Sequence, residues 1–93
     1  MINNVDLFNQ IVNDMSELYS KKNNDYGNSF EETANEFGLV APVIRISDKL
    51  NRLKSLLKRP QLVKESIEDT LLDMANYAIM TVIWLRNNDL SSK

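Results

Sequence analysis

The sequence predicts an all-α domain, a compact helical bundle of three long helices and one short helix. Apolar residues recur at spacings of three and four along most of the chain, which is the period of an amphipathic helix. No segment alternates apolar and polar residues as a half-buried β-strand would. Two glycines and two prolines interrupt the 93 residues, and a chain of this length is expected to form a single domain over residues 1–93.

The first helix is predicted from Val5 to Lys22. Its apolar face consists of residues three or four positions apart: Phe8, Ile11, Val12, Met15, Leu18 and Tyr19. Asn3 or Asn4 can cap its start, because their side-chain oxygens accept hydrogen bonds from free backbone N–H groups. Residues 23–28 are rich in asparagine, aspartate and glycine, so we expect a loop there.

A short second helix and a long third helix are predicted next. Ser29 and Glu32 have the spacing of a capping box, and Gly38 stands where the short helix would end. Pro42 suits the first turn of the third helix, which Pro60 would stop. The predicted buried stripe of the third helix consists of Val43, Ile46, Leu50, Leu53 and Leu57.

The last helix is predicted from Lys64 to Asn87, and its second half is apolar on every side from Ala78 to Leu85. A helix of that kind must be covered all round, by its own bundle and by a partner subunit. Small domains bury a low fraction of their surface, which also favours association. We therefore expect an oligomer, a homodimer or a homotetramer.

Composition excludes several classes of function. Cysteine and histidine are absent, so a thiolate or imidazole metal site is impossible and any metal must have oxygen ligands, which favours Mg²⁺. The net charge of −2 argues against a nucleic-acid partner. No apolar run is long enough for a membrane partner, and the N-terminus lacks the features of a signal peptide, so we expect a cytoplasmic protein.

Charged residues form stripes on the last two long helices. On the third helix, Arg45, Asp48, Lys49 and Arg52 share one side by the helical period, either as a solvated face or as an anion site. On the last helix, Glu65, Asp69 and Asp73 follow one turn apart, with Asn76 beside them. Because Asp73 lies within an apolar run, its carboxylate needs a partner. That partner is either Arg45, Lys49 or Arg52 in an ion pair, or a divalent ion.

The predicted loop is a third candidate for function. Asp25, Tyr26 and Gly27 offer a carboxylate, an aromatic face and a flexible backbone, although local evidence favours an ordinary turn without a function. Tyr77 and Trp84 are better explained as core or interface residues than as platforms for a base.

Three segments together, residues 22–27, 45–53 and 69–77, resemble a phage and bacterial family called the nucleotide modification associated domain, first type. The family is similar, more distantly, to the all-α nucleoside triphosphate pyrophosphatases typified by MazG and to the helical dUTPases. That resemblance implies a helical nucleotide-binding domain of nucleotide metabolism, in the host cytoplasm if phage-encoded. It also implies Mg²⁺ held by acidic residues, cleavage between the α- and β-phosphates, and assembly as dimers or tetramers.

The acidic motif of the pyrophosphatases is incomplete here. Asp73 matches its last aspartate, but Thr70 stands where a glutamate is expected. The predicted ligand-binding residues are Asp25, Tyr26, Arg45, Lys49, Arg52 and Asn76, and the predicted Mg²⁺ ligands are Asp48, Asp69 and Asp73. The first hypothesis is a nucleotide-binding domain, and it leaves open whether the domain also hydrolyses its ligand as a Mg²⁺-dependent pyrophosphohydrolase. The alternatives are a phage protein that sequesters a nucleotide signal of host defence and a purely structural oligomerisation module.

Overall fold

A computed structural model describes residues 3–26, 28–59 and 64–88, without the side chains of residues 24–26, 64 and 65. Four helices form in these ranges: α1 (Asn4–Tyr26), α2 (Ser29–Phe37), α3 (Val40–Leu57) and α4 (Lys64–Asn87). No β-strand occurs in the described residues. The predicted all-α fold of three long helices and one short helix is therefore confirmed.

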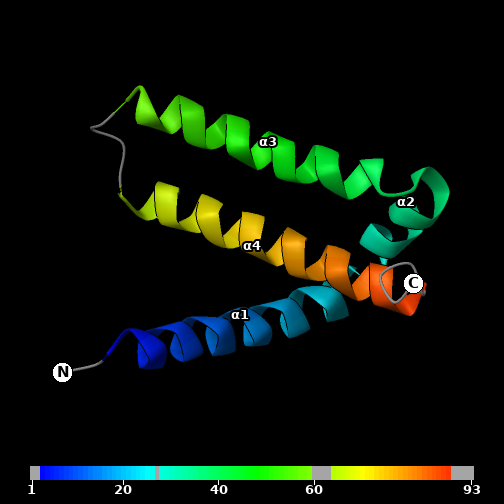
Figure 1. Cartoon of the computed structure of the whole chain (residues 1–93), viewed down its shortest axis with the longest axis horizontal. Helices are drawn as coiled ribbons and strands as arrows, with labels where there is room; N and C mark the ends of the chain where they lie inside the picture. Colours follow the sequence, from blue (N-terminus) through cyan, green and yellow to red (C-terminus); the bar gives the residue numbers. More distant parts are fainter. Residues whose placement is uncertain (1–2, 27, 60–63, 89–93) are drawn as a thin grey trace.

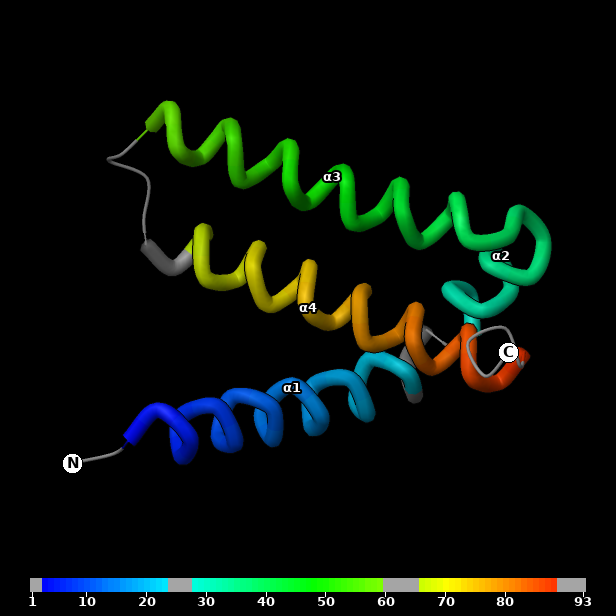
Figure 2. The backbone as a smooth tube through the Cα atoms, in the orientation of Figure 1, coloured from blue at the N-terminus to red at the C-terminus, as the bar shows by residue number. Residues whose placement is uncertain are grey.

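Helices α3 and α4 form an antiparallel hairpin, and α2 lies at one end of it (Figure 1). The pair α3 and α4 is the most extensive packing interface in the fold, whereas α1 touches α4 over a small area. Figure 2 shows that α1 approaches α4 near its own C-terminal end and diverges from it toward the N-terminus. The hairpin is thus the most extensively packed pair of helices in the described residues, and α1 packs on it over a small area.

Helix α1 starts as predicted and ends later than predicted. The Asp6 backbone N–H donates to Asn3 Oδ1 at 2.9 Å, which confirms Asn3 as the cap. The helix then continues to Tyr26, so the predicted loop over residues 23–28 is wrong for its first four positions. Extending a formed helix adds one backbone hydrogen bond per residue, and this outweighs the weak helix propensity of asparagine and aspartate.

The predicted cap at the start of α2 is wrong, and the predicted end of α2 is confirmed. Asn28, not Ser29, is the N-cap residue, and its side chain makes no capping hydrogen bond, so the predicted capping box is wrong. Gly38 ends the helix as predicted, with φ 79° and ψ −164°, and its N–H donates to Ala34 O at 2.8 Å. Glycine adopts this positive φ without the strain that a Cβ would bring.

The buried core of the described residues is small and lies between α2, α3 and α4. It contains Ala34, Pro42, Leu56 and Trp84, together with Thr70. The indole of Trp84 donates from Nε1 to Asn35 Oδ1 at 2.9 Å, which joins α4 to α2 and confirms Trp84 as a core residue. Pro42 lies in the first turn of α3 as predicted, and Pro60 lies outside the described residues.

The face of α3 that packs on α4 differs from the predicted stripe. Leu57 is 72% exposed, and Val43 and Leu50 are exposed as well, whereas the adjacent Leu56 is buried. Ile46 and Leu53 are half-buried as part of the true stripe, which runs through Pro42, Ile46, Lys49, Leu53 and Leu56. The apolar residues of α3 cover more than one side of the helix, and only contact with α4 selects which side is buried.

Helix α4 has the predicted bounds, and its first and last residues match the prediction. The expected all-round cover of its second half is incomplete within one chain, because Ile79, Val82 and Ile83 stay exposed. None of the described helices combines the length and the apolar composition needed to cross a membrane.

Candidate functional site

A cavity of about 320 Å³ opens where α1, the start of α2, α3 and α4 meet. Its lining residues are Tyr19, Lys22, Asn23, Ser29, Phe30, Arg45, Lys49, Asp73, Asn76, Tyr77 and Met80. Residues from all four helices contribute, so the cavity exists only in the folded chain. We call it the cationic cavity, because three of its side chains are lysine or arginine and one is acidic.

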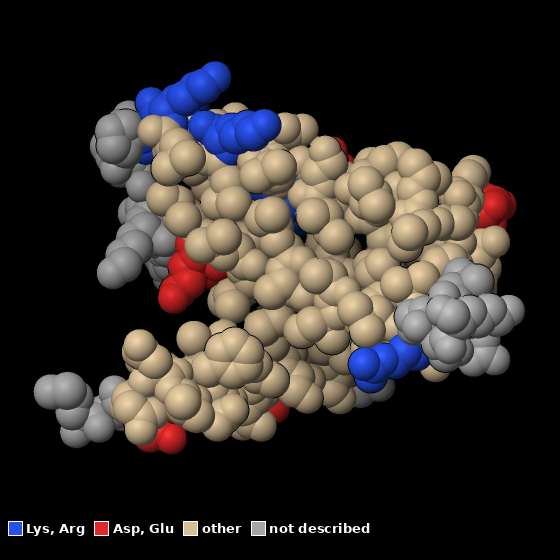
Figure 3. All heavy atoms as spheres, viewed as in Figure 1, with Lys and Arg blue, Asp and Glu red and all other residues tan. Residues whose placement is uncertain are grey.

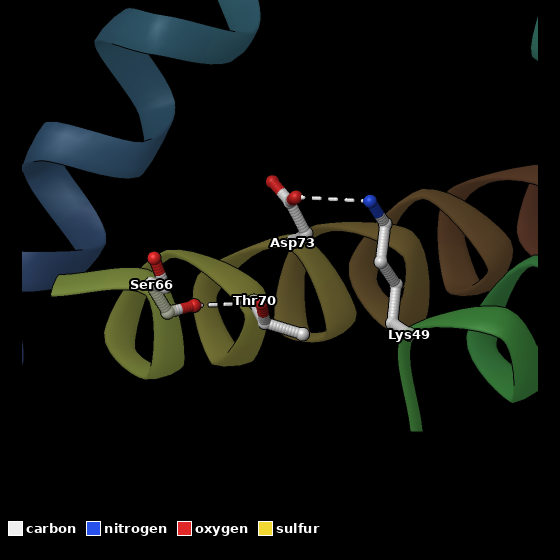
Figure 4. Close-up of polar contacts among 4 residues, drawn as sticks. All are labelled: Lys49, Ser66, Thr70 and Asp73. Carbon is white, nitrogen blue, oxygen red and sulfur yellow. Dashed lines mark hydrogen bonds and ion pairs between the residues drawn. The ribbon is translucent and has the colours of Figure 1, made fainter. Parts of the chain in front are cut away.

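One ion pair crosses the cavity wall from α3 to α4. Lys49 Nζ lies 3.2 Å from Asp73 Oδ2, and the two side chains are 29% and 42% exposed (Figure 4). Of the partners considered for Asp73, the structure therefore provides Lys49. The pair is too exposed to contribute more than about 1 kcal/mol to stability. Its clearer effect is geometric, because it holds the Lys49 ammonium at the cavity.

Two further cations line the same cavity. Arg45 lies one turn before Lys49 on α3, and Lys22 comes from the last part of α1. Within the described part of the chain the Lys49–Asp73 pair is the ion pair that forms, and no carboxylate there pairs with Lys22 or Arg45. Cations that face each other across a cavity repel unless an anion lies between them.

The start of α2 adds backbone donors to the cationic cavity. Ser29 and Phe30 line it, and they are the first two residues of α2. The Asn28 side chain makes no capping hydrogen bond to the first N–H groups of this helix, which have no partner within the helix itself. Free N–H groups at a helix start favour an anion such as a phosphate.

Aromatic rings form the apolar wall of the cavity. The rings of Phe30 and Tyr77 stack with their centroids 6.1 Å apart and an interplanar angle of 22°. Tyr19 and Met80 extend this wall. The cavity thus combines cationic groups, which attract an anion, with a flat apolar surface, on which a planar ring can pack.

The sequence prediction located part of this site. Four of the predicted residues line the cavity: Arg45, Lys49, Asp73 and Asn76. Three others, Asp48, Arg52 and Asp69, are exposed and do not line it. The side chains of Asp25 and Tyr26 lie outside the described residues, although their backbone belongs to α1 and not to a loop.

Sequence reasoning missed the contribution of α1 and α2 to the cavity. The apolar period places Tyr19 on the apolar face of the predicted first helix, and the turn-rich composition places Asn23 in the predicted loop. Lys22 is predicted only as the last residue of that helix, and Phe30 has no predicted role. The available signal was the helical period, which places Tyr19, Lys22 and Asn23 on one side once the helix is allowed to continue.

The predicted Mg²⁺ ligands are acidic residues, so the grouping of acidic side chains bears on that prediction. Among the described residues, no group of three or more acidic side chains lies close enough to hold a metal ion. Thr70, where the resemblance to the pyrophosphatases led us to expect a glutamate, is buried, and its hydroxyl donates to Ser66 O at 2.7 Å (Figure 4). A carboxylate at position 70 would therefore face the core. The role of Asp48, Asp69 and Asp73 as Mg²⁺ ligands stays a prediction.

Two other cavities adjoin the cationic cavity. One of about 260 Å³ lies between α1 and the first half of α4, and one of about 270 Å³ lies between α1 and the second half of α4. Tyr19 and Asn76 line all three. These two residues therefore mark the place where α1 crosses α4.

The fold and the cavity define a small all-α domain with a cationic site built from all four of its helices. The profile of the family described as nucleotide modification associated domain 1 matches residues 22–85. The chain therefore belongs to this family, as the resemblance of its three segments indicated. Searches of curated proteins and of solved structures gave no match. The matched range begins at Lys22, so it includes every residue of the cationic cavity except Tyr19.

Proposed function

We propose that the chain binds a nucleotide, with the phosphates in the cationic cavity. The observation that carries this proposal is the convergence of Lys22, Arg45 and Lys49, from two helices, on one cavity that has a single carboxylate in its described lining. Membership of a nucleotide modification associated family supports the same ligand class. At about 320 Å³, the cavity falls within the range of small-molecule sites.

Each group has a distinct part in this proposal. The guanidinium of Arg45 can donate two parallel hydrogen bonds to phosphate oxygens, whereas the ammonium groups of Lys22 and Lys49 act as point charges. Asp73 holds Lys49 in place through the ion pair. The N–H groups at the start of α2, which the Asn28 side chain does not cap, add neutral donors for the same phosphate.

The base and sugar would lie against the aromatic wall. The stacked Phe30 and Tyr77 rings offer a flat apolar surface, on which any base can pack. The amide of Asn76 lies beside them and can both donate and accept hydrogen bonds, which is what recognition of a base edge requires.

Hydrolysis and sequestration are two outcomes of the same binding step. A pyrophosphohydrolase would release pyrophosphate in the presence of Mg²⁺, and a sequestering protein would return the ligand intact. Binding through cations and backbone donors needs no metal centre, and the described residues provide those groups. We therefore propose binding as the shared function, and the fate of the ligand distinguishes the two.

Isothermal titration with pyrophosphate and a panel of nucleoside triphosphates tests this proposal. The substitution Arg45→Ala removes a charged hydrogen-bond donor from the cavity. It should weaken the binding free energy by about 1.5–3 kcal/mol, which corresponds to a roughly tenfold or greater loss of affinity. Arg52→Ala is the matched control, because Arg52 lies on the same helix, carries the same charge and does not line the cavity. Equal losses for both variants, or no binding by the unmodified chain, would overturn the proposal.

The fate of the ligand is read from the same samples. Chromatography after incubation with and without Mg²⁺ shows whether the nucleotide is intact. Pyrophosphate released only with Mg²⁺ would support the hydrolase, and intact ligand under both conditions would support sequestration.

A further inference from the structure

The cavity of about 260 Å³ between α1 and the first half of α4, which we call the second cavity, adjoins the cationic cavity. The two cavities share four lining residues: Tyr19, Lys22, Asp73 and Asn76. In Figure 3 the surface is hollowed between the limb formed by α1 and the rest of the molecule, and acidic side chains (red) lie beside this hollow. Because shared side chains form the boundary, a ligand in the cationic cavity lies next to the second cavity.

The second cavity has apolar walls. They are formed by side chains of α1 and α4, namely Ile11, Met15, Leu18 and Leu72. Pockets for small molecules are typically lined in this way, with a few polar groups that select the ligand. A phosphate gains nothing from apolar walls, whereas the ring of a base loses unfavourable contact with water there. The second cavity therefore suits the base end of a nucleotide better than its phosphate end.

Two carboxylates line the second cavity without lining the cationic cavity. Asp14 comes from α1 and Glu68 from α4. Lys22 lines the second cavity too, but within the described residues the Lys49–Asp73 pair is the ion pair that forms, so Lys22 neutralises neither carboxylate. An ionised carboxylate accepts hydrogen bonds and donates none, and its two oxygens can accept two parallel ones. A base in this cavity should therefore present N–H donors.

The spacing of these carboxylates favours hydrogen bonding to a ligand over shared binding of a metal ion. Asp14, Glu68 and Asp73 line the same cavity, yet no three acidic side chains of the described residues lie close enough together to hold a metal ion. Carboxylates that stand apart can each accept a hydrogen bond from a different N–H group on the edge of one base.

We infer that the second cavity selects guanine as the base of the bound nucleotide. This inference rests on the proposed function, which places the phosphates in the cationic cavity and the base on the stacked Phe30 and Tyr77 rings. A base on these rings lies beside Asn76, which lines both cavities, so its edge can extend past Asn76 into the second cavity.

The hydrogen-bonding edges of the bases explain the choice of guanine. Guanine carries two adjacent donor groups, a ring N–H and an exocyclic amino group, and these match the two oxygens of a carboxylate. Adenine and cytosine offer the amino group alone. Uracil and thymine have a carbonyl oxygen on each side of their ring N–H, and a carboxylate repels both oxygens.

Titration with guanosine triphosphate (GTP), inosine triphosphate (ITP) and pyrophosphate tests the inference. ITP is GTP without the exocyclic amino group, so the two ligands carry the same charge and differ by one donor group. The unmodified chain should bind GTP roughly tenfold more tightly than ITP, because ITP lacks a hydrogen bond to a charged acceptor. Asp14→Asn combined with Glu68→Gln should reduce this ratio to less than about twofold, since an amide also donates hydrogen bonds.

Glu17→Gln combined with Asp69→Asn is the matched control. It removes two negative charges from the same two helices, at exposed positions that line neither cavity. Asp14 and Glu68 are exposed as well, so both double variants should fold. The control should keep the tenfold preference for GTP. Pyrophosphate should bind the two double variants with affinities within about threefold of each other at moderate salt, because both have lost the same net charge.

Each outcome decides the inference. Equal binding of GTP and ITP by an unmodified chain that binds pyrophosphate would overturn it and leave the proposed function intact. A preference for GTP that persists without the Asp14 and Glu68 carboxylates, or that the control variant also loses, would overturn it as well. If neither pyrophosphate nor any triphosphate binds, the proposed function fails and this inference fails with it.

Discussion

The substitution Asp73→Asn distinguishes two roles for this carboxylate, as the partner that positions Lys49 and as the ligand of a metal ion. If Asp73 positions Lys49 beside an anion site, its negative charge opposes anion binding, and removing it should strengthen the binding of pyrophosphate. If Asp73 holds a metal ion that carries the phosphates, the same change should abolish Mg²⁺-dependent binding. The two roles therefore predict opposite changes in the affinity for pyrophosphate.

The expected size of the effect follows from the geometry. Lys49 Nζ is 3.2 Å from the Asp73 carboxylate, so an anion on the same ammonium lies on the order of 5 Å from it. Because Asp73 is 42% exposed, a dielectric close to that of water applies, and the repulsion is about 1 kcal/mol per charge. Counting only the one phosphate charge that lies on Lys49, pyrophosphate should therefore bind roughly fivefold more tightly to the variant.

The same substitution should make the fold slightly less stable, although it strengthens binding. Loss of a half-exposed ion pair should lower the free energy of unfolding by about 0.5–1 kcal/mol. Urea unfolding followed by circular dichroism measures this at one fixed protein concentration, which removes any contribution from association. A loss of several kcal/mol would show that Asp73 is a buried structural partner, contrary to its exposure.

Asp69→Asn is the matched control for binding. Asp69 lies one turn before Asp73 on α4, is exposed and does not line the cationic cavity, so the same change in net charge should leave the binding constant nearly unchanged. The assay is titration with pyrophosphate at low and moderate salt, without and then with Mg²⁺. Weaker metal-free binding in Asp73→Asn than in the unmodified chain would refute the reasoning.

Two further substitutions test the fold. Leu56→Ala should lower the free energy of unfolding by about 2–4 kcal/mol, because Leu56 is buried. Leu57→Ala should lower it by less than about 0.5 kcal/mol, because Leu57 is exposed. Equal losses in urea unfolding would show that the buried side of α3 is assigned wrongly. Gly38→Ala should lower the free energy of unfolding by about 1–3 kcal/mol, because φ 79° with ψ −164° is strained for any other residue. This strain is the whole expected cost, since a Cβ at position 38 would meet no neighbouring atom. An unchanged melting temperature would contradict the prediction.

The local period of the sequence determined which elements form. Spacings of three and four, together with Asn3 and Gly38 at helix ends, were enough to predict the all-α fold and the bounds of α4. These are short-range properties, since capping and amphipathicity depend on residues within a turn or two of each other. The same period placed Arg45 and Lys49 one turn apart on α3.

Only the tertiary structure decided which side of each helix is buried and which side lines the cavity. The apolar residues of α3 spread over more than one side, and contact with α4 buried Leu56 and left Leu57 exposed. The end of α1 was likewise decided by continuation of the helix, which local propensity did not predict. That continuation places Lys22 on the wall of the cationic cavity. Helix periodicity specifies what lies on one helix, but a cavity between four helices depends on how they pack, which no single segment encodes.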